Sequence, residues 1–217
     1  MDFQFQQTVQ NLDPVLQLLI VMSLLALVPI VIITMTSFLR FVIVLSILRT
    51  ALGTQQVPPA MVIVGLAFIL TMYTMSPTFI DMYERGNKVH NEGASLVSAL
   101  AEASVPLKDF MLRQSQESDV AFFYQLSKNQ PPNDPSEINL IEAAPAFMIG
   151  ELRTSFKIGF IIFIPFIVLD LVVANILLAL GMFMLSPTII SLPFKLLIFI
   201  AVDGWGLIIH GLVKSFN

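Results

Sequence analysis

Charged residues inside apolar stretches are the groups of this 217-residue chain that could do chemistry. Asp170, Lys195 and Asp203 all lie in its apolar C-terminal part. A charge in a low-dielectric region needs a partner, so these positions predict buried ion pairs or a path for ions. Arg40 and Arg49 pose the same problem nearer the N-terminus. They are nine residues apart, which places them on opposite faces of a helix and indicates that the helix packs against protein.

A sulfur-rich cluster closes the longest apolar stretch of the C-terminal part. Met182, Phe183 and Met184 follow the run that begins at Ile158 and precede Ser186-Pro187. An unbranched thioether repacks easily around different shapes, so methionines suit either a core or an adaptable seal. On composition alone, core filling is the more common use.

Composition indicates a membrane-type protein. Hydrophobic residues make up 56% of the chain and charged residues 12%, against about 25% charged in a typical soluble domain. The net charge of -4, without a basic stripe, argues against nucleic-acid binding. With no cysteine, the redox compartment cannot be read from the sequence.

The sequence gives no support for enzymatic chemistry. It contains no HExxH, GxGxxG, P-loop or nucleophile constellation. His90 and His210 have no partner at metal-ligand spacing, so we interpret both as structural or surface residues. We therefore expect no catalytic residue, no metal and no cofactor.

The placement of the charges predicts the organisation of an all-α chain. Eighteen of the 26 charged residues fall between Thr78 and Lys157. We expect hydrophobic helices over residues 1–77, a polar helical insert over 78–157, and a hydrophobic helical hairpin with a methionine-rich turn over 158–217. The first eleven residues contain no Lys or Arg, so they lack the basic start of a secretory signal peptide.

Within the N-terminal part, Pro14 to Leu39 is a candidate membrane span with a kink at Pro29. Phe38 to Leu52 is expected to be helical, and the apolar run Met61 to Met75 follows. Glycine, glutamines and paired prolines between them predict a hairpin turn at Gly53, Gln55, Gln56, Pro58 and Pro59. By the positive-inside rule, Arg40 and Arg49 would keep this turn cytoplasmic and put the polar insert in the periplasm.

The insert shows amphipathic periodicity from Pro106 to Ser127, which predicts one or two helices. A proline-rich tract over 128–135 predicts a loop. From Ser136 a helix is expected to resume, to bend at Pro145 and to continue into the stretch from Ile158. If the last two segments fold back at Ser186-Pro187, Asp203 lies level with Asp170, and Lys195 lies level with Leu178.

Three blocks of sequence carry a family resemblance. Residues 48–59, LRTALGTQQVPP, resemble the first motif of the FliP family of type III export-gate proteins. Residues 145–160, PAFMIGELRTSFKIGF, are similar to the second motif, and 193–205, PFKLLIFIAVDGW, to the third. Residues 106–114, PLKDFMLRQ, look like the flagellar branch. Gly150, Ala60 and Phe183 depart from the usual serine, asparagine and methionine.

The resemblance implies a gate for unfolded proteins in the bacterial inner membrane at the flagellar basal body. Several copies would assemble with FliR-like and FliQ-like subunits into a helical multi-subunit complex, in contact with FlhB-like and FlhA-like components, flagellar substrate proteins and membrane lipid. It favours the Met182 to Met184 cluster as the pore constriction. In a staggered assembly, Glu151 of one copy is predicted to pair with Lys195 of the next.

Two alternatives stay open. The injectisome counterparts share the three motifs, so the chain could serve that secretion system. An ion- or proton-coupled transporter would also carry Asp170, Lys195 and Asp203 inside its spans.

Overall fold

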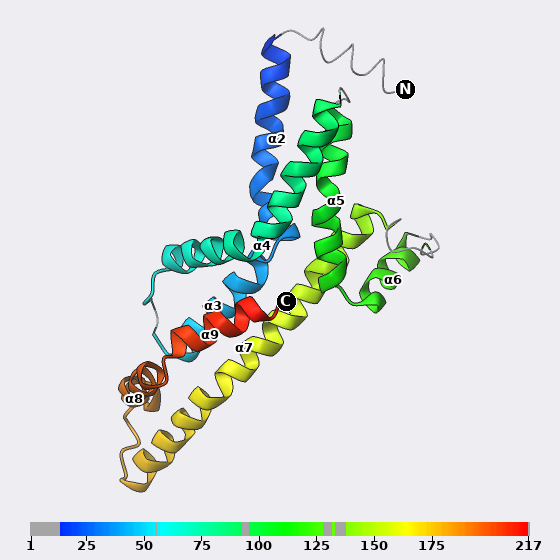
Figure 1. The fold of residues 1–217 in the computed structure, drawn as a ribbon. Coiled ribbons are helices and arrows are strands. Elements are labelled where there is room, and N and C mark those ends of the chain that lie inside the picture. Colours follow the sequence, from blue (N-terminus) through cyan, green and yellow to red (C-terminus); the bar gives the residue numbers. More distant parts are fainter. Residues whose placement is uncertain (1–13, 55, 93–95, 128–131, 133–137, 217) are drawn as a thin grey trace. The chain divides into compact units, whose positions relative to one another are not determined.

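The computed structural model describes residues 14–54, 56–92, 96–127, 132 and 138–216, and all regular structure in that part of the chain is helical. The predicted all-α class is therefore confirmed (Figure 1). The helices are α2 (Pro14–Met35), α3 (Phe38–Ala51), α4 (Ala60–Asn91), α5 (Leu96–Gln114), α6 (Glu117–Leu126), α7 (Leu140–Ala179), α8 (Pro187–Ala201) and α9 (Gly204–Lys214).

Some predicted features lie outside the described residues. These are the basic-free N-terminal segment of residues 1–11, the turn residue Gln55, the proline-rich loop apart from Pro132, and the side chain of His90.

The chain forms two compact units. Unit 1 combines Met1–Thr36 with Met75–Phe147, and unit 2 combines Ser37–Thr74 with Met148–Asn217. The sequence boundaries at 77/78 and 157/158 both fall inside continuous helices, α4 and α7. A polar composition can begin in mid-helix, because a change in solvent exposure does not require a break in backbone hydrogen bonding.

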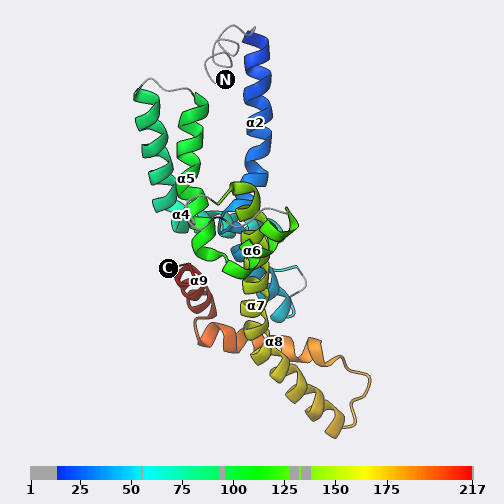
Figure 2. The ribbon, with the colours of Figure 1, turned by 90° about the vertical axis from the view of Figure 1, so that its right-hand side faces the viewer.

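In unit 1, the second half of α4 and α5 run side by side (Figures 1 and 2). Their contact is close because a Cβ at Gly86 would lie only 3.1 Å from the Cβ of Ala103. α5 begins ten residues before the predicted start at Pro106 and includes that proline. The predicted amphipathic stretch is thus the end of α5 together with α6.

Aromatic contacts hold the rest of unit 1 together. Phe110 and Phe147 pack edge to face with ring centroids 5.8 Å apart. Tyr124 packs with Val120 and Ala146, and its hydroxyl accepts a hydrogen bond from the Asn139 amide at 3.2 Å. These contacts explain why α6 packs against the start of α7.

α7 is the longest of the described helices, 40 residues that continue through Pro145 and Pro165, and it belongs to unit 2 from Met148 onward. α3 lies close to it, because a Cβ at Gly159 would come within 2.4 Å of Ile47 Cδ1. α8 and α9 meet at a bend of 64°. Asp203 lies at this bend with φ 50°, in the left-handed region that short polar residues tolerate better than most.

By length and composition, α7 and the Ala60–Val89 part of α4 are each long and apolar enough to cross a membrane. Two bent pairs, Ala26–Met35 with Phe38–Ala51 and Pro187–Ala201 with Gly204–Lys214, bring the number of candidates in the described chain to up to four if each pair is one span. The predicted span from Pro14 to Leu39 is not one helix, since α2 continues through Pro29 and ends at Met35.

Candidate functional site

Arg40 on α3 is the centre of a buried ion pair in unit 2. Its Nε donates to Glu151 Oε2 at 2.7 Å, and its Nη2 donates to Glu151 Oε1. The side chains of Arg40 and Glu151 are 3% and 0% exposed. This two-bond geometry matches the planar guanidinium to the carboxylate, which makes it the strongest kind of charged hydrogen bond.

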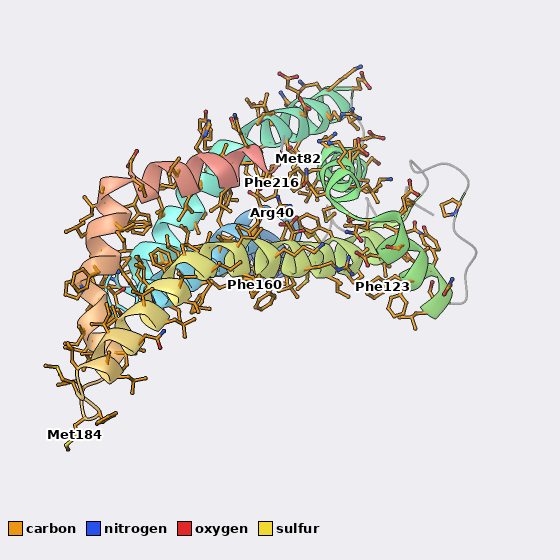
Figure 3. The ribbon with its side chains drawn as sticks, turned by 90° about the horizontal axis from the view of Figure 1, so that it is seen from below. Arg40, Met82, Phe123, Phe160, Met184 and Phe216 are labelled. Atoms are coloured by element: carbon orange, nitrogen blue, oxygen red, sulfur yellow. The ribbon has the colours of Figure 1, made fainter. Side chains whose placement is uncertain are left out.

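The same guanidinium holds the C-terminal end of α9. Arg40 Nη1 donates to both the carbonyl oxygen and the hydroxyl of Ser215, each at 2.8 Å. Its Cζ lies 3.6 Å from the centre of the Phe216 ring, which in turn packs on Phe41 (Figure 3). A cation at a helix C-terminus is favourable because the last carbonyl groups lack intrahelical partners. Arg40 therefore ties α3, α7 and α9 together.

A second ion pair joins α7 and α8. Lys195 Nζ lies 2.7 Å from Asp170 Oδ2 and donates to the carbonyl oxygen of Ala51, the last residue of α3, at 3.2 Å. Ser191 donates its hydroxyl to the other carboxylate oxygen of Asp170. The Lys195 side chain is 3% exposed and that of Asp170 33%. This cluster fixes the two arms of the α7–α8 hairpin to each other and to the end of α3.

The predicted hairpin register is wrong. The turn is not at Ser186-Pro187 but occupies all of residues 180–186, between the ends of α7 and α8 at Ala179 and Pro187. Facing positions then sum to about 366, the total of 179 and 187, and Asp170 with Lys195 sums to 365. Asp203 lies beyond the end of α8, and Lys195 faces Asp170 rather than Leu178.

The predicted pairing of Glu151 with Lys195 between copies is not supported either, because each has a partner within its own chain. The signal that was missed was present in the sequence. Arg40 lies in an apolar stretch and so requires an acid, but Glu151, which meets that need, was assigned to Lys195 of another copy.

Arg49 and the predicted turn residues lie at the end of α3 and beyond it. Arg49 Nη1 donates to the carbonyl oxygen of Pro58 at 3.4 Å, and the Thr54 hydroxyl donates to the Arg49 carbonyl at 3.3 Å. Gly53 has φ +77°, a left-handed conformation that a glycine adopts without strain. Gly53, Gln56, Pro58 and Pro59 thus all lie between α3 and α4.

The methionine cluster lies at the tip of the α7–α8 hairpin, which we define as residues 180–186. α7 ends in a Schellman motif, in which Met182 N donates to Leu177 O and Gly181 N donates to Leu178 O, with Gly181 at φ +74°. Met182, Phe183 and Met184 are 46%, 76% and 99% exposed. Figure 3 shows Met184 at the far end of the hairpin. These side chains do not fill the core of the chain.

The described residues hold no group of three or more His, Asp or Glu side chains that could bind a metal. The site is therefore a pair of internal ion clusters that support an exposed apolar tip. Such an arrangement is consistent with a helical membrane-type protein.

Comparison with known proteins gives the family. The model of the FliP family matches residues 21–212. The "Flagellar biosynthetic protein FliP" of Caulobacter vibrioides is 49% identical, over 94% of this chain and 77% of that protein. The protein of the same name from Bacillus subtilis is 43% identical over 95% and 94%. The "Virulence protein YscR" of Salmonella typhimurium is 41% identical over 94% and 98%. The chain belongs to the FliP family, as the three motifs predicted.

Proposed function

We propose that this chain is a core subunit of the flagellar type III protein export gate. Copies of it and partner subunits form a pore for unfolded proteins, and Met182, Phe183 and Met184 close that pore. The observation that carries the proposal is the exposure of these three side chains at the tip of a hairpin that is internally fixed. The family assignment supports a component of the export apparatus rather than an enzyme.

The three neighbouring side chains at the tip are apolar and exposed together. Contiguous apolar surface on a protein marks an interaction site, and Met184 at 99% exposure contacts almost nothing within its own chain. When several copies place their tips together, the tips cover one another. Methionine and phenylalanine would then form a seal that repacks around a passing chain.

The proposed partners are other copies of this chain, FliR-like and FliQ-like subunits, FlhB-like and FlhA-like components, and unfolded flagellar proteins. The proposed place is the inner membrane at the flagellar basal body, with the polar insert in the periplasm. This orientation was predicted from Arg40 and Arg49. Arg40 is buried in an ion pair, so Arg49 is the charged residue that lies next to the turn between α3 and α4.

Cross-linking tests the pore. The chain contains no cysteine, so Met184→Cys provides a single thiol at the tip. We expect copies within the assembled complex to cross-link through it, while the exposed control Lys214→Cys does not. An assembled complex in which the Met184→Cys copies do not cross-link would contradict a shared constriction.

Thiol labelling tests the orientation. Glu84 on α4 is exposed and belongs to the polar insert. Glu84→Cys in intact cells should react with a membrane-impermeant maleimide added outside. Labelling only after lysis would place the insert on the cytoplasmic side.

The injectisome is the second candidate, because the Salmonella relative named for virulence is 41% identical. Deletion of the gene separates the two systems. Loss of motility and of flagellar filaments supports the flagellar function, whereas normal motility with lost effector secretion supports the injectisome.

A further inference from the structure

Two thioethers lie on the tip of the α7–α8 hairpin. Met184 is 99% exposed and Met182 46%, with Phe183 between them. The chain contains no cysteine, so methionine thioethers are its only sulfur groups. Peroxides oxidise a thioether to a sulfoxide, and an exposed sulfur reacts fastest because the oxidant must reach it. The tip is therefore open to this chemistry.

Other methionines of the chain provide internal comparisons. Met75 and Met111 are completely buried, whereas Met61 on α4 is 85% exposed but lies outside the hairpin. Exposure alone thus predicts rapid oxidation at Met184 and Met61 and slow oxidation at the two buried positions. The tip differs from Met61 because it carries two thioethers within three residues of a connection that is not helical.

The fold of the subunit should tolerate oxidation of the tip. The Schellman motif at the end of α7 uses only backbone groups, among them Met182 N. The cluster that joins the arms of the hairpin consists of Asp170, Lys195 and Ser191, together with a backbone carbonyl. None of these interactions involves a methionine sulfur. A sulfoxide oxygen at an exposed tip accepts hydrogen bonds from water, so it costs the single chain little.

Between apolar side chains the same group is unfavourable. Oxidation turns a flexible apolar side chain into a polar one and disrupts methionine-rich contacts. A sulfoxide surrounded by methionine and phenylalanine of other copies would lack a hydrogen-bond donor and would draw in water. Oxidation should therefore act on contacts between tips and not on the fold of the subunit.

We propose that Met182 and Met184 form a reversible oxidation site that opens the seal. In the forward step hydrogen peroxide transfers an oxygen atom to the thioether: the O–O bond breaks, an S–O bond forms, and the peroxide is reduced to water. In the reverse step the dithiol of a sulfoxide reductase supplies two electrons and two protons, the oxygen leaves as water, and the dithiol becomes a disulfide. The reactivity belongs to the single chain, whereas the effect on the seal rests on the function proposed above.

Peptide mass spectrometry locates the oxidation. The purified full chain in detergent is treated with hydrogen peroxide, and the oxidised fraction at each methionine is followed over time. We expect Met184 to react on the order of tenfold faster than Met75 and Met111, with Met182 between them. In denaturant the rates should converge, because exposure no longer differs. Equal rates in the folded chain would overturn the oxidation site.

Conductance measurements test the effect on the seal. Membrane vesicles that contain the assembled complex are compared before and after hydrogen peroxide, so each variant is its own reference. We expect a severalfold rise in ion conductance for the original complex, reversed by a methionine sulfoxide reductase with a dithiol. Met182→Leu combined with Met184→Leu keeps apolar side chains of similar size and should abolish the rise. The exposed control Met61→Leu should retain it.

Three results with the complex would overturn the proposal. These are a tip that peroxide does not oxidise, an oxidised tip without added conductance, and a rise that persists in the double leucine variant. Replacing Met182, Phe183 and Met184 with alanine separates this failure from failure of the proposed function. If the alanine variant leaks without peroxide and the oxidised complex does not, only the oxidation proposal fails. If neither leaks, the proposed constriction fails as well.

Discussion

The base of the α7–α8 hairpin, at Asp170 and Lys195, and its tip differ in polarity and in burial. At the base, the charges of Asp170 and Lys195 are matched within one chain, with Ser191 and the Ala51 carbonyl completing the hydrogen bonds. At the tip, Met182, Phe183 and Met184 are apolar and are 46%, 76% and 99% exposed. The comparison teaches that the single chain fixes the position of the hairpin by paired charges, whereas it leaves the apolar tip exposed.

This division follows from the energies involved. A buried charge without a partner costs several kcal/mol, so ion pairs must be satisfied in each folded subunit. An exposed methionine costs far less, because much of any protein surface is apolar. Changes at the ion pairs should therefore act on folding, and changes at the tip should act on the proposed seal.

The largest effect is expected at Glu151. Glu151→Ala leaves Arg40 buried without a counter-charge, which should lower the free energy of unfolding by about 3–5 kcal/mol. The measurement is chemical unfolding of the purified chain in detergent. The double variant Arg40→Met with Glu151→Leu should recover most of the loss, because it removes both charges. A single variant as stable as the original chain would show that the pair does not hold α3, α7 and α9 together.

A smaller effect is expected at Lys195. Lys195→Met removes the charged hydrogen bond to Asp170, and we expect a loss of about 2–3 kcal/mol in the same unfolding assay. The loss should be below that at Glu151 because Asp170 is one-third exposed and water can replace part of the interaction. The matched control Lys214→Met, at an exposed position, should change stability little. A loss at Lys195 larger than at Glu151 would reverse the order proposed for the two pairs.

The bend between α8 and α9 gives the next effect. A Cβ at Gly204 would lie 2.2 Å from the Phe199 ring, so Gly204→Ala should cost about 1–2 kcal/mol through overpacking. Gly211 on the same helix has nothing within 4 Å, so Gly211→Ala should be neutral or stabilising by up to about 1 kcal/mol. Thermal unfolding of the two variants measures the difference. Equal stability of the two would show that Phe199 yields without cost.

The smallest effect on the isolated chain is expected at the tip. Replacing Met182, Phe183 and Met184 with alanine removes side chains that are largely exposed, so stability should change by less than about 0.5 kcal/mol. The same unfolding assay measures this change. A loss of several kcal/mol would mean that the tip is part of the fold of the single chain.

Much of this fold was predictable from the sequence. The charge-free runs indicated apolar helices, and Gly53 with the paired prolines indicated the break between α3 and α4. The domain boundaries were harder, because α4 and α7 continue through changes in polarity without a break in the backbone. Side-chain pairing was harder still. A shift of a few residues in the assumed turn moved the predicted partner of Asp170 from Lys195 to Asp203.

The exposure of the methionine cluster could not be predicted from its composition. Its composition alone favours a core position, yet in the structure it lies exposed at the end of a helical hairpin. Periodicity cannot reveal this, because the cluster lies in a seven-residue connection that has no helical face to compare.

Ion leak through the assembled complex tests the central claim most directly. Cells that carry Met182→Ala, Phe183→Ala and Met184→Ala together should assemble the complex in normal amounts, because the subunit itself stays folded. Removing these side chains from every copy should leave an opening, so we expect a higher ion conductance across the inner membrane than in cells with the original chain. Normal assembly with no added conductance would contradict a seal at the tip of the hairpin.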